Sequence, residues 1–173
     1  MTTTCNFCRK QLHFYNNEYK CAYCGKVMCR KCIIKVPFDE DIDDLLRRAD
    51  DSYNSPNQRL IVRSYYLCKS CTANYIAKYN AMQEAKQDHD DIKTVSENYQ
   101  GSKFDKLQKV KKLQTYYYKS KYDAEEDIKA MAKYLGCTHI LGLTFDKGEG
   151  EEEGPKGGTH YYTTWSAIGF AAL

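Results

Sequence analysis

The sequence lacks a long apolar run and an apolar leader. Its longest apolar stretch, Trp165 to Leu173, contains Ser166 and Gly169 and is far shorter than the roughly 20 residues that a membrane span needs. The first residues, Met1 to Cys5, show neither the basic nor the apolar region of a secretory signal peptide. We therefore expect a cytoplasmic chain whose cysteines are reduced and available to a metal.

Residues arranged for catalysis are also missing. No serine or carboxylate stands at a recognisable catalytic spacing from any of the four histidines, which are His13, His89, His139 and His160. No glycine-rich phosphate loop follows an expected strand, and the glutamates beside Gly148 and Gly150 would repel a phosphate. We therefore expect that the protein is not an enzyme.

Cysteine, in contrast, is abundant and regularly spaced. Eight of the nine cysteines form four Cys-x-x-Cys pairs: Cys5/Cys8, Cys21/Cys24, Cys29/Cys32 and Cys68/Cys71. One such pair is also typical of redox proteins, but two pairs complete a tetrahedral zinc site with four sulfur ligands. Four pairs therefore predict two zinc ions. Because cysteine supplies every expected ligand, we expect closed, structural sites.

The net charge of +3 at pH 7 is small, but the charges are segregated. Basic residues dominate 1–36 and 101–122, whereas carboxylates dominate 39–51 and 146–153. Such alternation is more often typical of a solvated surface than of a site.

The sequence predicts an α+β protein with three parts. We expect a zinc-binding domain at 1–75 with an acidic helical insertion at 37–58, a helical linker at 76–105, and a β-α-β-β domain at 106–173.

In the first part, a helix is predicted from Asp39 to Ala49, with Ile42, Leu45 and Leu46 on its apolar stripe and Pro37 near its first turn. The β-branched and aromatic residues from Arg59 to Leu67 predict a strand. After Cys71, two helical stripes are expected: Tyr75, Ile76, Tyr79 and Met82, and then Ile92, Val95 and Tyr99.

In the last part, strands are predicted at 113–119, 138–145 and 159–172. A helix is predicted from Asp123 to Leu135 and ends before Gly136. The Gly- and Glu-rich stretch 146–158 is expected to be a mobile loop.

The spacing C-x2-C-x12-C-x2-C-x4-C-x2-C from Cys5 to Cys32, followed by Cys68 and Cys71, resembles that of the FYVE family of zinc fingers. Gly25, directly after Cys24, also fits that family. The resemblance covers about the first 75 residues and implies a treble-clef, FYVE-like module with interleaved pairs. Cys5, Cys8, Cys29 and Cys32 would then bind one zinc ion, and Cys21, Cys24, Cys68 and Cys71 the other.

The family's usual ligand is phosphatidylinositol 3-phosphate, which it binds through a basic motif, R-(R/K)-H-H-C-(R/K), around the third cysteine. The corresponding residues here are Asn17 to Ala22, in which Lys20 is the only basic residue and Glu18 would repel phosphate. The resemblance therefore implies the zinc scaffold without the headgroup site. Phe14 and Tyr15 stand where FYVE domains carry a membrane-inserting tip, although packing against the zinc core is an equally good interpretation.

A weaker resemblance concerns Ala132 to Leu143, which is similar to the helix–strand element of the YbjQ-like bacterial family, a family labelled as heavy-metal binders. Cys137 and His139 are the only candidate ligands there, and no third ligand is near in sequence. We expect Cys137 to be a buried small apolar residue instead.

Two functions remain open at this point. The first is a non-catalytic, FYVE-related adaptor or complex subunit that binds protein partners through the helices after Cys71 or the C-terminal sheet. The alternative is peripheral binding to anionic endosomal membranes, with attraction from basic residues: Arg9, Lys10, Lys20, Arg30 and Lys31. A third, less favoured interpretation is nucleic-acid binding by the basic segment Lys103–Lys121, with bases stacked on the nearby tyrosines Tyr116, Tyr117, Tyr118 and Tyr122.

Overall fold

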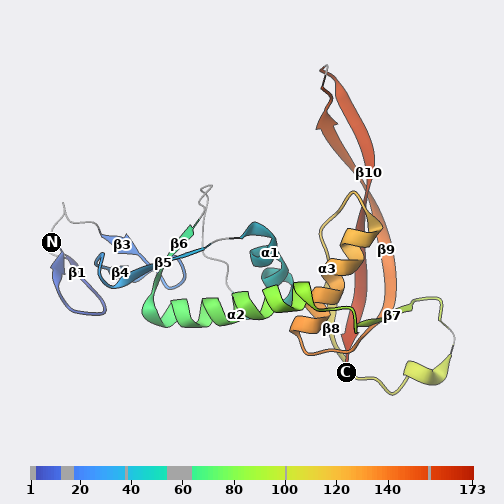
Figure 1. Ribbon diagram of the computed structural model, residues 1–173, viewed down its shortest axis with the longest axis horizontal. Coiled ribbons are helices and arrows are strands. Elements are labelled where there is room, and N and C mark those ends of the chain that lie inside the picture. Colours follow the sequence, from blue (N-terminus) through green and yellow to red (C-terminus); the bar gives the residue numbers. More distant parts are fainter. Residues whose placement is uncertain (1–2, 13–17, 38, 54–63, 100, 156) are drawn as a thin grey trace. The chain divides into compact units, whose positions relative to one another are not determined.

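Figure 1 shows the computed structural model of this mixed α/β protein. The structure describes residues 3–12, 18–37, 39–53, 64–99, 101–155 and 157–173. The chain forms two compact units. The N-terminal unit comprises Met1–Arg47 and Asp51–Asn80, and the C-terminal unit comprises Arg48–Asp50 and Ala81–Leu173.

Three short antiparallel strand pairs build the N-terminal unit. They are β1 (Thr3–Thr4) with β2 (Gln11–Leu12), β3 (Tyr19–Lys20) with β4 (Val27–Met28), and β5 (Ile33–Pro37) with β6 (Ser64–Cys68). Strands of two residues have too few ladder hydrogen bonds to be stable alone. The β1–β2 and β3–β4 pairs therefore depend on other contacts, and cysteines lie in or next to all three pairs.

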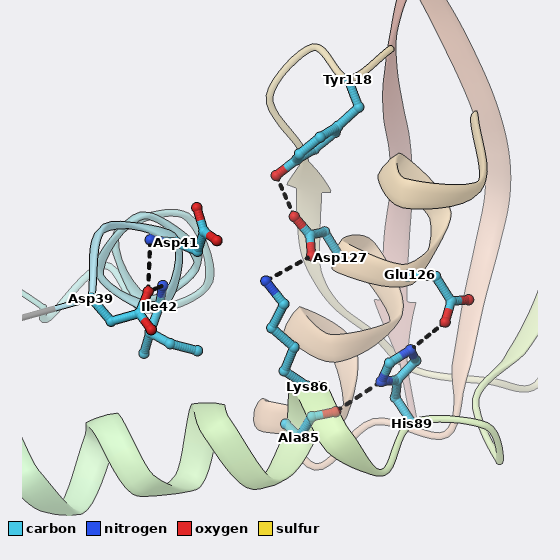
Figure 2. A network of polar contacts seen from close by, with 9 residues as sticks. All are labelled: Asp39, Asp41, Ile42, Ala85, Lys86, His89, Tyr118, Glu126 and Asp127. Carbon is cyan, nitrogen blue, oxygen red and sulfur yellow. Dashed lines mark hydrogen bonds and ion pairs between the residues drawn. The ribbon is translucent and has the colours of Figure 1, made fainter. Parts of the chain in front are cut away.

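Helix α1 (Glu40–Ala49) forms where its apolar stripe predicts it. Its first turn is capped by Asp39, whose carboxylate accepts hydrogen bonds from the backbone N–H groups of Asp41 and Ile42 at 3.0 and 3.2 Å (Figure 2). The apolar stripe that includes Leu45 and Leu46 is buried. Pro37, in contrast, is the last residue of β5 rather than part of the helix.

The expected strand from Arg59 to Leu67 is found in part. Strand β6 begins at Ser64, and residues 54–63 lie outside the described residues. Helix α2 (Lys69–Gln87) follows directly and buries Tyr75 and Met82.

The prediction of a second helical stripe through Ile92, Val95 and Tyr99 is wrong. Lys93–Ser96 forms strand β7, with Ile92 and Val95 buried and Tyr99 exposed. The segment 76–105 is therefore not helical throughout.

The C-terminal unit is built on a four-stranded sheet with the order β7-β9-β10-β8. Its other strands are β8 (Lys109–Gln114), β9 (His139–Glu153) and β10 (Thr159–Ala172), and α3 (Lys121–Tyr134) connects β8 to β9. Strand β7 runs parallel to β9, whereas β10 is antiparallel to both β9 and β8 (Figure 1).

One face of the sheet carries α3. Ile128 and Met131 of this helix are fully buried, and a methyl group at Gly169 of β10 would lie 3.7 Å from Ile128 Cδ1. The other face carries a second apolar cluster, formed by Val95, Leu141, Ala172, Phe104, Leu107 and Phe170. The segment around the 3-10 turn Ser102–Phe104 thus packs on the face opposite α3.

Two predicted boundaries in this unit are corrected. The strand expected at 113–119 lies at Lys109–Gln114, and only Tyr118 of the tyrosine run forms a further bridge, to Trp165. The loop expected at 146–158 is mostly strand, because β9 extends to Glu153 and pairs there with Thr159. Aromatic rings cover its glycines: Tyr117 lies against Gly148 and Tyr162 against Gly150.

Polar contacts join the end of α2 to α3 within this unit. His89 contacts the carbonyl oxygen of Ala85 at 3.0 Å and Glu126 at 2.9 Å, and Lys86 lies 3.7 Å from Asp127 (Figure 2). The Tyr118 hydroxyl donates a hydrogen bond to the same Asp127 carboxylate. None of the helices in the described part of the chain is long and apolar enough to cross a membrane.

Candidate metal centres

The eight paired cysteines gather into two groups in the N-terminal unit. The first group is Cys5, Cys8, Cys29 and Cys32, and the second group is Cys21, Cys24, Cys68 and Cys71. Within each group all sulfur atoms lie within 4.8 Å of one another. This is the interleaved grouping that the FYVE resemblance implies.

The first cysteine pair of each group lies in a hairpin turn, and the two turns have the same backbone hydrogen bonds. Cys5 and Cys8 lie in the turn between β1 and β2, and Cys21 and Cys24 lie in the turn between β3 and β4. In each turn the backbone N–H of the first cysteine donates to the carbonyl of a lysine, Lys10 or Lys26, at 2.9 Å.

The residue after each second cysteine adopts a left-handed conformation. This residue is Arg9 in the first turn and Gly25 in the second, with φ of 62° and 69°. Its N–H donates back to the carbonyl of Cys5 or Cys21 at 3.0 or 2.8 Å. The backbone thereby turns both sulfur atoms of the pair towards one point.

The other two pairs come from different elements. Cys29 and Cys32 lie in the turn between β4 and β5, whereas Cys68 ends β6 and Cys71 lies in the first turn of α2. Each pair is linked to its partner hairpin in the same way. The N–H of Cys29 donates to Cys5 Sγ at 3.4 Å, and the N–H of Cys68 donates to Cys21 Sγ at 3.3 Å. Such N–H···S hydrogen bonds orient and stabilise a metal-binding thiolate.

The sulfur geometry fits a tetrahedral metal ion. Four sulfurs at about 2.3 Å from a zinc ion lie about 3.8 Å apart. The distance from Cys8 Sγ to Cys29 Sγ is 3.8 Å, and that from Cys24 Sγ to Cys68 Sγ is 3.9 Å. Both groups therefore fit a metal with four thiolate ligands.

The electrostatics of the groups also favour a cation. Burial raises the pKa of the Cys5 thiol, but hydrogen bonds from the backbone N–H groups of Cys8 and Cys29 outweigh burial and lower this pKa to about 6. Burial and the neighbouring thiols raise the pKa of Cys32 to about 12. Four thiolates so close together repel one another, and a divalent cation among them removes that obstacle.

The second group has the same contrast. Burial raises the pKa of Cys68, but the Ser70 hydroxyl and the N–H of Cys71 lower it to about 6. The pKa of Cys71 itself is raised, first by burial and then by its sulfur neighbours. Each group thus has at least one thiol ready to bind a metal at neutral pH.

The ninth cysteine is not part of either group. Cys137 is 2% exposed, in the C-terminal unit, and His139 is half-buried against Phe104 at a ring distance of 5.5 Å. Neither residue belongs to a cluster of three or more metal-ligating side chains in the described part of the chain.

The residues considered for lipid binding are placed only in part. Glu18 precedes β3 and Lys20 is its last residue, and both are exposed, whereas Phe14 and Tyr15 lie outside the described residues. Sequence reasoning also missed Arg9, Lys10 and Ser70 as residues that shape the centres. The recurrence of Lys two residues after Cys8 and after Cys24 was the available signal.

Comparison with models of protein families gives no match, and no curated protein and no solved structure is found to be similar to this chain.

Proposed function

We propose that this chain is a FYVE-like, zinc-stabilised adaptor or complex subunit that is not an enzyme and acts by binding other proteins. The observation that carries the proposal is the pair of interleaved groups, each with four sulfur ligands and none of another kind. Four thiolates occupy all four coordination positions of a tetrahedral zinc ion and leave none for water or substrate. The ions then fix the fold, and surfaces of the protein perform the function.

The surroundings of the second group support a treble-clef, FYVE-like module. This group is held by a short turn with Cys21 and Cys24, by the end of the β5–β6 pair, and by the first turn of a long helix at Cys71. A turn, a hairpin and a helix around one zinc ion are the parts of a treble clef.

The charges near the third cysteine argue against a phosphoinositide headgroup as the ligand. Lys20 is the single basic residue beside Cys21, and Glu18 is exposed close to it. A phosphate group is bound by several cationic or N–H donors, which this position does not supply.

Peripheral membrane binding is the second candidate. Phe7 is 56% exposed beside the first group, and five exposed basic side chains surround the centres: Arg9, Lys10, Lys20, Arg30 and Lys31. Exposed aromatic and basic side chains attract a protein to anionic lipid without headgroup specificity. Under this alternative the protein would act at endomembranes.

Metal analysis tests the proposed zinc centres. Purified protein is expected to carry about two zinc equivalents, and the Cys24→Ser variant should lose about one of them. Cys137→Ser is the matched control and should keep both. Visible absorption from iron, or equal zinc loss in both variants, would contradict the proposal.

Liposome flotation tests the two candidate functions: binding to anionic vesicles over neutral ones is expected only for the membrane alternative, and a comparison of phosphoinositide isomers tests headgroup specificity. We expect no preference for phosphatidylinositol 3-phosphate over its 4- and 5-phosphate isomers at equal vesicle charge. A clear preference for the 3-phosphate would instead restore the membrane function.

A further inference from the structure

The edge of the C-terminal sheet at β7 contains a groove. Four consecutive residues of this strand, Lys93 to Ser96, line a cavity of about 570 Å³ together with Asn98, Tyr99 and Phe104. Strand β7 is the outermost strand on this side of the sheet in the described part of the chain (Figure 1). The groove is therefore bounded by a strand edge on one side and by aromatic side chains on the other.

The backbone of Thr94 faces this groove. Lys93 N–H donates to Thr138 O at 3.1 Å, on the side of β9. Successive residues of a strand direct their N–H and C=O groups to opposite sides, so those of Thr94 point to the open edge. An open edge of this kind is a template for a further strand.

The opposite wall is aromatic. The rings of Tyr99 and Phe104 lie 5.2 Å apart, and Tyr99 is 46% exposed. Val95 and Phe104 also belong to the apolar cluster on the face opposite α3. An apolar side chain in the groove would thus contact two rings and the margin of a packed core.

The charge at the groove is positive. Lys93 lines the cavity, Lys103 Nζ lies 5.6 Å from the Phe104 ring, and no carboxylate lines this cavity. Both lysines are exposed, and neither has an ion pair among the residues that the structure describes. Burial, and then the charges of these two lysines, lower the pKa of His139. Glu97 and Asp105 line an adjoining cavity, which shares Val95, Ser96, Tyr99 and Phe104 with the groove.

We propose that the β7 groove binds an extended acidic peptide segment of a partner protein, which adds as a strand to the edge of the sheet. The segment pairs its backbone with Thr94, places an apolar side chain between Tyr99 and Val95, and directs a carboxylate to Lys93 and Lys103. This inference rests on the proposed function, whose partner class it specifies.

An extended peptide fits the groove better than a compact small molecule does. Four successive strand residues line the cavity, so its length follows β7, and backbone pairing is available only to another polypeptide strand. A second copy of β7 is a poor occupant, because it would bring its own Lys93 and Lys103 to a groove that already carries these two lysines.

The test is a selection of random 12-residue peptides on the intact, zinc-loaded protein, followed by affinity measurement on variants. Selected peptides should alternate apolar and acidic residues and should slow hydrogen exchange of the Thr94 amide. Thr94→Pro removes the outward N–H at an edge position that tolerates proline, and it should weaken binding at least tenfold. Thr94→Ala keeps the N–H and should bind normally.

Charge variants make the test independent of the proline. Lys93→Glu, in the lining of the groove, and Lys103→Glu, whose Nζ lies over the ring of the groove residue Phe104, should each weaken binding about tenfold. Lys106→Glu, on an exposed lysine outside the lining, should not. Circular dichroism and thermal unfolding confirm that each variant is folded.

If the selected peptides bind Thr94→Pro and the Lys93 and Lys103 variants as well as they bind wild type, the proposed peptide site in the β7 groove is wrong. The adaptor function is not contradicted by that result. Failure to select any peptide would also overturn the groove. Loss of the zinc equivalents would overturn the proposed function separately.

Discussion

At the scale of single residues, the two cysteine turns place different demands on the residue that follows them. Arg9 and Gly25 occupy the same left-handed position, with φ of 62° and 69°. A residue with a Cβ atom is strained there by about 1 kcal/mol, whereas glycine is not. The first turn therefore already contains a strain that the second avoids.

This difference gives the first prediction. Gly25→Ala should destabilise the N-terminal unit by about 1 kcal/mol, while Arg9→Ala should change its stability little. No other atom would obstruct the added methyl group at Gly25, so strain alone causes the effect. Chelator competition, monitored through the release of zinc, measures this loss of stability in each variant. Equal effects of the two substitutions would contradict the argument.

Glu126 gives a prediction about pH. Burial raises its pKa, but hydrogen bonds with His89 and Lys129 outweigh burial and keep the pKa below its usual value. A depressed carboxylate pKa contributes stability above the unfolded pKa of about 4.3, and this contribution is lost as the pH falls through the folded pKa. The C-terminal unit should therefore be less stable in acid.

Urea unfolding of wild type and Glu126→Gln measures this contribution. The variant should be less stable than wild type near pH 7, and the difference should shrink as the pH falls below about 4.3. Glu153→Gln, at the exposed end of β9, is the control. A difference that grows in acid would refute the assignment.

At the scale of elements, the contact between α3 and the sheet requires a residue without a side chain. A methyl group at Gly169 of β10 would lie 2.6 Å from Ile140 Cγ2, in the fully buried interior. Gly169→Ala should therefore destabilise the unit by about 1–3 kcal/mol through overpacking. Gly154→Ala, whose methyl group would make only ordinary contacts, with Gly158 O at 3.5 Å and Gly157 O at 3.8 Å, should be near neutral in thermal unfolding.

The elements that sequence reasoning identified are those with a clear apolar period. The stripes of α1 and α3 have the helical spacing and are buried, so both helices are found as expected. Strand β7 was missed for two reasons. Ile92, Val95 and Tyr99 have helical spacing, and a strand of four residues has too short an alternating pattern to outweigh that spacing.

The part of β9 from Asp146 to Glu153 was missed for a different reason. Gly148 and Gly150 indicate a loop when their neighbours in sequence are considered, but their cover comes from Tyr117 and Tyr162, which are distant in the chain. Aromatic rings across a strand pair can take the place of the missing side chains. The cysteine pairs were easier, because the Cys-x-x-Cys spacing alone brings two thiols together in a turn. Their interleaving into two groups was expected only from the FYVE resemblance, and the N–H···S bonds depend on the fold.

At the scale of the whole molecule, the candidate metal centres and the four-stranded sheet belong to different units. The cysteine groups lie in the N-terminal unit, whereas the single tryptophan, Trp165, lies in the C-terminal unit. A structural zinc ion contributes about 10 kcal/mol or more to a small domain. Removing both ions should therefore unfold the N-terminal unit and leave the C-terminal unit folded.

Chelation followed by two probes tests this separation. Hydrogen exchange should become fast in the N-terminal unit, while Trp165 fluorescence should stay unchanged until heat or urea unfolds the sheet. A simultaneous loss of both signals on chelation would show that the units fold as one.

The interleaving of the cysteine groups also sets an order in time. The first group is complete once Cys32 has been made, but the second waits for Cys71, after α1 and β6. At about 5–20 residues per second, the ribosome needs roughly 2–8 seconds for that interval. A nascent chain could thus hold one metal ion while Cys21 and Cys24 still await their partners, and during those seconds these two thiols are the most vulnerable to a wrong disulfide.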